Sequence, residues 1–128
     1  MGILNNIFSS SEENQSDSKV GWRQLADLGQ LNEIITESAE KPVIIFKHST
    51  RCGVSRMVLK QFENEFDLQE KITPYFLDLL EHRNVSNEIA SRFGVFHQSP
   101  QLIVIRDGIA VYNESHGSID AGQLEQFI

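Results

Sequence analysis

Apolar positions along the chain follow two different spacings, and the change from one to the other predicts a strand followed directly by a helix. Residues 42–48, PVIIFKH, form a β-branched and aromatic run typical of a strand buried on both faces of a sheet. Residues 53–66 then carry an apolar stripe at helical spacing. The members of the stripe are Val54, Val58, Leu59, Phe62 and Phe66. We therefore expect strand, tight turn and helix in immediate succession.

The chain before this unit divides into a polar segment, a short strand and a helix. Residues 9–19, SSSEENQSDSK, are polar and of low complexity, so residues 1–19 are expected to form a flexible N-terminal tail. Trp22 and Leu25 fit a short first strand. Apolar residues at helical spacing then predict a helix over about 30–40, which ends before Pro42.

The chain after this unit continues with a strand and a helix. Residues 72–80, ITPYFLDLL, are typical of a strand in which Pro74 lies near the start or at an edge, because proline cannot donate to a ladder. A further helix is expected over residues 84–93. Its expected boundary residues are Asn84 or Ser86 as the cap and Gly94 as the stop.

The last part of the chain predicts a hairpin and a terminal helix. Two strand-like runs in residues 101–113 flank Asp107-Gly108, a dipeptide that strongly favours a hairpin turn. Residues 119–128 resemble a helix with Asp120 near its start. Residues 20–128 are therefore expected to form one α/β domain, with a central mixed β-sheet flanked by helices on both faces.

Composition and charge limit the classes of function. The 128 residues are 40% hydrophobic and 23% charged, which is typical of a globular protein. The net charge of −7 disfavours nucleic-acid binding, and no apolar run approaches the ~20 residues that cross a bilayer. The start of the chain lacks a basic n-region and a long apolar h-region, so we do not expect a secretion signal there, and the four histidines show no paired ligand spacing. We expect a cytoplasmic protein with no metal, nucleic-acid or membrane partner.

The single cysteine, Cys52, lies at the predicted turn between strand and helix. Residues 41–60 carry five basic residues and no acidic one, so positive charge gathers around it. A helix start also presents unpaired backbone N–H groups, which favours the thiolate that reacts. Free cysteines usually pack as small hydrophobic residues. Because Cys52 stands between Arg51 and Gly53 at a turn, away from the apolar stripe, a reactive role is favoured.

The third residue after Cys52 is Ser55, so the segment has no second thiol. The Ser55 hydroxyl is expected on the same side of the first helical turn, where it can donate to the thiolate. A mixed disulfide at Cys52 then cannot be released from within the chain, and a thiol from another molecule must release it. The pattern indicates a monothiol site.

Four segments together resemble the YtxJ family of bacillithiol-system redox proteins, the monothiol bacilliredoxins, which have a thioredoxin-like fold. The segments are KPVIIF, KHSTRCGVS, SPQLIVIRDG and SHGSI, and the resemblance runs from about Trp22 to Phe127. It implies a thiol-disulfide oxidoreductase in which Cys52 attacks mixed disulfides between client proteins and bacillithiol. Cys52 would carry the bacillithiol until a low-molecular-weight thiol removes it. Bacillithiol is thus an implied co-substrate, and no resident cofactor is implied.

The thioredoxin-like fold also implies a cis-proline opposite the nucleophile, and Pro100, after Ser99, matches that position. Cys52 is then the implied catalytic residue. The residues expected to stabilise its thiolate are Arg51, Gly53, Val54 and Ser55. The residues expected to bind substrate are Lys47, His48, Thr50, Arg56, Ser99 and Pro100. The basic members suit the carboxylates of bacillithiol, although glutathione is acidic as well.

Two alternative functions remain open at this point. The Cys-Gly-Val-Ser segment differs by one residue from the Cys-Gly-Phe-Ser of monothiol glutaredoxins, which bridge iron–sulfur clusters with glutathione. An iron–sulfur cluster-binding or carrier protein is therefore the first alternative, although residues 107–120 lack the double-glycine and aspartate signature of glutaredoxins. A non-catalytic thioredoxin-like docking domain is the second alternative.

Overall fold

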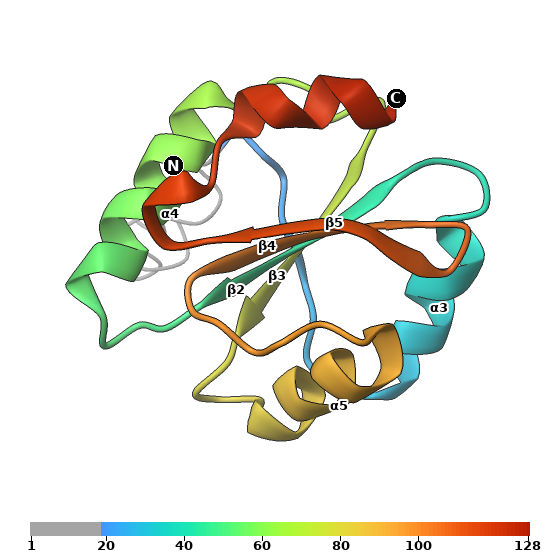
Figure 1. The fold of residues 1–128 in the computed structure, drawn as a ribbon, viewed down its shortest axis with the longest axis horizontal. Helices are drawn as coiled ribbons and strands as arrows, with labels where there is room; N and C mark the ends of the chain where they lie inside the picture. The colour runs from blue at the N-terminus through green and yellow to red at the C-terminus, as the bar shows by residue number, and fades with distance from the viewer. Residues whose placement is uncertain (1–18) are drawn as a thin grey trace, which may run out of the picture.

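A five-stranded mixed sheet in the order β1-β3-β2-β4-β5 forms the centre of the computed structural model, which describes residues 19–128 (Figure 1). The strands are β1 (Arg23–Gln24), β2 (Val43–His48), β3 (Thr73–Asp78), β4 (Gln101–Arg106) and β5 (Ile109–Ser115). The first three are mutually parallel, and β4 and β5 are antiparallel to their neighbours. The predicted α/β class with a mixed sheet is confirmed. The predicted N-terminal tail lies, up to residue 18, outside the described residues.

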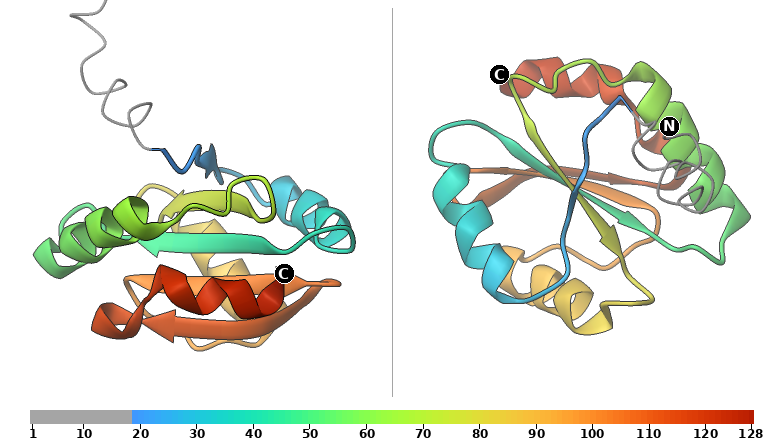
Figure 2. Two further views of the ribbon diagram at one scale, coloured as in Figure 1. Left: turned by 90° about the horizontal axis from the view of Figure 1, so that it is seen from above. Right: turned by 180° about the vertical axis from the view of Figure 1, so that it is seen from behind.

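Helices cover both faces of the sheet (Figures 1 and 2). The helices are α3 (Gly29–Glu37), α4 (Gly53–Glu65), α5 (Arg83–Phe93) and the 3-10 helices η1 (His116–Ser118) and η2 (Ala121–Phe127). Side chains alternate along β2, so Val43 and Ile45 pack with α3 and α5 while Ile44 and Phe46 pack with α4 and η2. Every residue of β2 is buried, as the sequence predicted for this strand.

The core between the sheet and α4 is largely aromatic. The Phe62 ring lies 5.8 Å from the Trp22 ring and 5.4 Å from both the Phe46 and Phe66 rings, measured between centroids. Phe62 and Phe66 thus confirm the predicted inward stripe of α4. Val54, predicted on the same stripe, is instead 53% exposed, because the first turn of α4 projects beyond the end of β2 (Figure 1).

The start of α5 differs from the prediction. His82 is the N-cap, with no side-chain capping hydrogen bond, whereas Asn84 or Ser86 was expected to cap the helix. Ser86 lies within the first turns, where its buried hydroxyl is 3.3 Å from Nδ1 of His97. Ser86 therefore does not cap α5, because its side chain contacts His97, which lies beyond the end of the helix.

Other element boundaries are close to those expected. The first strand contains only Arg23 and Gln24, with Trp22 and Leu25 on either side of it. The last helix is a 3-10 helix, capped by Asp120, whose side chain accepts from the Gly122 N–H at 2.9 Å. The predicted hairpin is confirmed. Its turn residues Asp107 and Gly108 have φ values of 53° and 76°, and positive φ at both positions is required in a two-residue hairpin turn of type I′.

Pro74 is the second residue of β3, as expected near a strand start. Strand β1 pairs only with Tyr75 and Phe76, so the ladder on that side begins after the proline. On the other side of β3, Pro74 lies opposite Ile44 of β2. The missing N–H group therefore leaves the paired part of β1 intact.

Gly94 ends α5 in the left-handed region, with φ of 66°. Replacing Gly94 with alanine is expected to lower the free energy of unfolding by about 1 kcal/mol, because a Cβ is unfavourable at this φ. An added Cβ would meet no atom within 4 Å, so the cost comes from the backbone alone. Urea denaturation measures the change. The matched control is Gly117→Ala, where space is equally open without a positive φ; equal destabilisation by both variants would contradict the interpretation.

Candidate active site

Cys52 lies between β2 and α4 as the N-cap of a 13-residue helix. Its backbone is extended, with φ of −105° and ψ of 120°, and its carbonyl accepts the first helical hydrogen bond from the Arg56 N–H at 3.1 Å. The side chain is half-buried, while Gly53 and Val54 after it are exposed. The thiol thus lies at the end of the helix where backbone N–H groups lack helical partners, as the sequence predicted.

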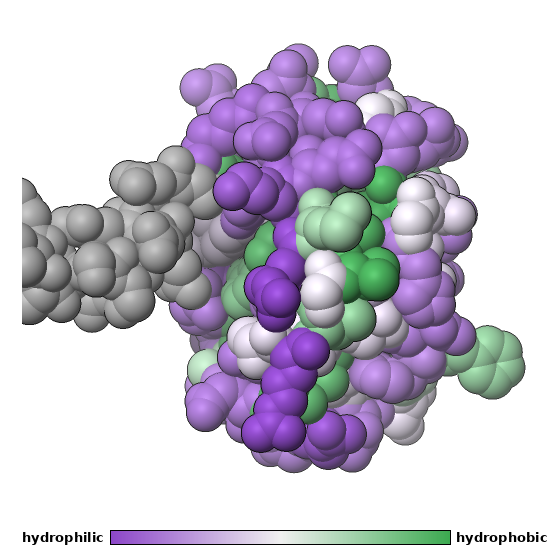
Figure 3. Space-filling view, turned by 90° about the vertical axis from the view of Figure 1, so that its left-hand side faces the viewer, coloured by the Kyte–Doolittle hydropathy of each residue, from purple (hydrophilic) through white to green (hydrophobic). Residues whose placement is uncertain are grey.

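The sheet brings Ser99-Pro100 to the same end of the molecule. Strands β2 and β4 are antiparallel, and Lys47 near the end of β2 is in register with Gln101 at the start of β4. The Ser99-Pro100 peptide bond just before β4 is cis, as expected. Figure 3 looks onto this side of the molecule and shows an apolar area bordered by hydrophilic side chains. The cysteine loop, which follows β2, and the cis-proline, which precedes β4, therefore lie at the same end of these two strands.

Two polar groups mark the surroundings of the cis-proline. The Pro100 carbonyl accepts a hydrogen bond of 3.0 Å from the N–H of His116, which ties the proline to the end of β5. The Ser99 hydroxyl oxygen is buried without a hydrogen-bond partner among residues 19–128. A buried hydroxyl of this kind gains from any polar group that a bound molecule brings to it.

Ser55 does not have the contact that the sequence predicted. It is fully buried, and its hydroxyl lies 2.8 Å from His48 Nδ1 and accepts from the Ser49 N–H at 3.1 Å. No hydrogen bond joins Ser55 to the Cys52 sulfur within the part of the chain that the structure describes. Ser55 therefore fixes the connection between β2 and α4, and the expectation that it donates to the thiolate is wrong for this structure.

His48 belongs to the same buried group and does not face the surface. It is 5% exposed, and its ring centroid lies 5.5 Å from that of Phe76. Burial lowers the pKa of His48, Asp78 raises it, and the positive charge of Arg56 lowers it. Its predicted substrate contact is therefore not supported, and His48 acts through Ser55 as part of the support beneath the cysteine loop.

Lys47 is the largest correction to the predicted site. It was expected in a basic rim around Cys52, yet it is fully buried, on the face of β2 opposite to Phe46 and His48. Its ammonium lies 2.7 Å from Nδ1 of His97, and burial lowers the pKa of Lys47 to about 8. Lys47 therefore cannot form part of an exposed binding surface.

The basic rim that remains consists of two arginines. Arg51 and Arg56 are exposed, and the Arg56 guanidinium donates to the carbonyl of Thr50 at 3.2 Å. The ion pairs between side chains of residues 19–128 are Arg23–Glu37 and Arg92–Glu88, so neither rim arginine is neutralised by a carboxylate there. Both positive charges stay available to an acidic ligand near Cys52.

Gln101 supports the site although its role was not predicted from the sequence. Gln101 is fully buried, and its amide donates to the Phe96 carbonyl at 2.9 Å and accepts from the Gln98 N–H at 3.3 Å. It thereby holds the segment that leads into Pro100. The signal was a polar side chain directly after the proline, at the start of an otherwise apolar strand.

Two other kinds of site are absent from residues 19–128. Among residues 19–128, no three or more histidine, cysteine, aspartate or glutamate side chains gather as a metal ion would require. No helix of this range combines the length and apolar character needed to span a bilayer.

Comparison with known proteins extends the interpretation. A sequence profile of the family described as "Monothiol bacilliredoxin BrxC" matches residues 23–124. A solved structure described as an oxidoreductase with a thioredoxin fold is 33% identical, with a TM-score of 0.69, over 80% of this chain and 89% of the other.

Two thioredoxins are similar in fold. The thioredoxin of Malassezia sympodialis is 18% identical with a TM-score of 0.65, over 83% of this chain and 86% of its own. The thioredoxin of Fasciola hepatica is 19% identical with a TM-score of 0.62, over 81% and 93%. Fold and family together support a redox role and confirm the predicted resemblance. The chain belongs to the monothiol bacilliredoxin family, BrxC.

Proposed function

We propose that the protein removes bacillithiol from mixed disulfides on client proteins, with Cys52 as the nucleophile. The observation that carries the proposal is a half-buried thiol at the start of a long helix in a chain with no second cysteine. Membership of the bacilliredoxin family supports bacillithiol as the co-substrate. A reducing compartment such as the cytoplasm suits a free thiol of this kind.

The first step is an attack by the Cys52 thiolate on the bacillithiol sulfur of the mixed disulfide. The client–bacillithiol S–S bond breaks, the client sulfur leaves as a thiolate and takes a proton, and a Cys52–bacillithiol disulfide forms. The backbone N–H groups at Gly53 and Val54 favour the thiolate before attack and after its return. The client is thereby reduced, and the bacillithiol is held on the protein.

The second step needs a thiol from outside the chain. A low-molecular-weight thiol, bacillithiol itself in the simplest case, attacks the bacillithiol sulfur of the Cys52 adduct. This step forms a low-molecular-weight disulfide and restores the Cys52 thiolate. Ser55 cannot replace this thiol, because its hydroxyl is buried against His48 and carries no sulfur. Two electrons thus pass from the small thiols to the client disulfide.

Substrate binding in this proposal involves both sides of the cysteine loop. Arg51, Arg56 and the Thr50 backbone lie on the loop side, where exposed positive charge suits the carboxylates of bacillithiol. Ser99 and cis-Pro100 lie on the other side, where extended backbone of a disulfide-bearing client can pair. Lys47 and His48 have no direct part in this binding.

The proposal is tested by exchange with two matched disulfides. Reduced full-length protein is mixed with one client protein carrying either bacillithiol or glutathione, and intact mass is followed over time. We expect a bacillithiol adduct on Cys52, formed faster than the glutathione adduct. Absence of any adduct would overturn the exchange activity, and faster reaction with glutathione would overturn bacillithiol as the substrate. An absorbance spectrum of anaerobically purified protein tests the cluster alternative, since a bridged iron–sulfur cluster is coloured.

A further inference from the structure

Lys47 is a buried cation for which the fold alone gives no reason. It is fully buried, and no carboxylate among residues 19–128 lies within ion-pair distance of it. Replacement of a buried charge by an apolar side chain is often neutral or stabilising, so such a residue points to a role outside stability. Within the described part of the chain, residues 19–128, its ammonium has one hydrogen-bond partner, Nδ1 of His97 at 2.7 Å.

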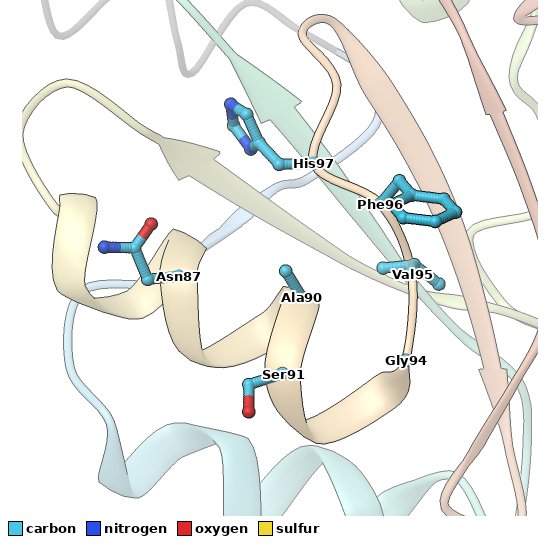
Figure 4. A pocket seen from close by; sticks show the side chains of 7 residues that line it. All are labelled: Asn87, Ala90, Ser91, Gly94, Val95, Phe96 and His97. Atoms are coloured by element: carbon cyan, nitrogen blue, oxygen red, sulfur yellow. The ribbon is translucent and has the colours of Figure 1, made fainter.

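His97 belongs to the 95–99 segment, which leads directly into cis-Pro100. Buried polar side chains from three different elements hold this segment. Lys47 of β2 and Ser86 of α5 both contact His97 Nδ1, at 2.7 and 3.3 Å, while Gln101 of β4 bonds the backbone at Phe96 and Gln98. Figure 4 shows the His97 and Phe96 side chains on opposite sides of the segment. Phe96 is 90% exposed and adds no packing, whereas Val95 is buried in the core beside α3 and α5. The start of the segment is thus fixed by Val95, and the part that leads into the proline is fixed by the polar contacts of His97 and Gln101.

The contact between Lys47 and His97 works in one protonation state of the histidine. An ammonium group has donors and no acceptor, so Nδ1 of His97 must accept and the ring is neutral. A proton on Nδ1 would remove the acceptor and place two cations 2.7 Å apart. Burial lowers the pKa of His97, and the charges of Lys47 and Arg83 lower it further, which agrees with a neutral ring at neutral pH.

His97 is exposed to solvent, and no acidic side chain among residues 19–128 pairs with Lys47 or acts on His97 to offset this second positive charge. On the strands beside Lys47, β3 contributes Leu77 and β4 contributes Gln101, both uncharged. Helix α5 contributes Ser86 and the cation Arg83, which acts on His97. A proton on His97 is therefore repelled by both Lys47 and Arg83, and the neutral neighbours Leu77, Gln101 and Ser86 do not compensate for that repulsion.

We propose that Lys47 is a positioning residue which, through neutral His97, holds the 95–99 segment and with it cis-Pro100 in place for thiol exchange. Acidification releases the segment by protonating His97. The inference rests on the proposed exchange at Cys52, because positioning has meaning only for that reaction.

The test compares wild type with His97→Asn, in which an amide oxygen can accept from Lys47 but does not titrate. Exchange rates are measured from pH 7.5 to pH 5, and the wild-type rate is divided by the variant rate, so that ionisation of Cys52 cancels. We expect this ratio to fall roughly threefold or more toward pH 5. His82→Asn, at the half-buried N-cap of α5, is the control and should leave the wild-type profile unchanged.

A readout without activity accompanies the rates. In an NMR titration, the backbone amides of residues 95–98 should shift together with the His97 ring in wild type, and this step should be absent from His97→Asn. If the amides do not follow His97, or if the rate ratio stays flat while exchange is active, the positioning role is overturned. If wild type shows no exchange at pH 7.5 although the amides follow His97, the proposed function fails, and positioning for it fails as well.

Discussion

Replacing Cys52 with serine is expected to reduce the transfer of bacillithiol to the rate seen without protein. No other cysteine exists in the chain, and a serine hydroxyl neither ionises near neutral pH nor displaces a thiolate from a disulfide. The Cys52 side chain makes no capping hydrogen bond, so stability should change by no more than about 0.5 kcal/mol. Intact mass follows client release, and urea denaturation checks the fold.

Ser55→Ala provides the matched contrast on the same helical turn. This variant leaves His48 Nδ1 and the Ser49 N–H without their buried partner, so the free energy of unfolding should fall by about 1–3 kcal/mol. Transfer of bacillithiol to Cys52 should continue in the folded variant. Loss of transfer at full stability would show that the Ser55 hydroxyl acts on the thiolate after all, and transfer by Cys52→Ser would refute Cys52 as the nucleophile.

The fold was predictable where spacing within a few residues determines structure. The run PVIIFKH, the stripe ending in Phe62 and Phe66, and Asp107-Gly108 each contain their own signal, and all three elements formed as expected. The start of α5 was not predictable in this way. Ser86 is a good capping residue by local rules, but its hydroxyl contacts His97, eleven residues later, and that contact depends on the path of the intervening chain.

The site shows the same division, with one error that the sequence could have prevented. The two-residue alternation of β2 places Lys47 on the opposite face from Phe46 and His48, and a strand buried on both faces leaves no exposed position for a rim. The positive charge of Lys47 therefore did not indicate whether its side chain lies at the surface or in the core. The Ser55–His48 contact, in contrast, depends on the conformation of residues 49–52 and could not be read from spacing.

Replacing Lys47 with methionine is expected to raise the free energy of unfolding at pH 7 by about 1–4 kcal/mol, because methionine fills a similar volume without a buried charge. The same change should slow thiol exchange, since His97 and the 95–99 segment lose their contact with β2. Stability and activity would then move in opposite directions. Urea denaturation and the exchange assay, applied to the same preparations, measure both.

The pH dependence separates the buried charge from a change in packing. Folded Lys47 releases its proton near its pKa of about 8, whereas the unfolded chain keeps it up to the ordinary value of 10.5. Between pH 8 and pH 10.5 the unfolded state binds more protons than the folded state. The free energy of unfolding of the wild type therefore rises with pH, by about 3 kcal/mol across this range. The advantage of Lys47→Met should therefore disappear above pH 10. Lys71→Met, at an exposed position, should show no such trend. A destabilised Lys47→Met variant with a difference independent of pH would mean that the ammonium supports the fold itself.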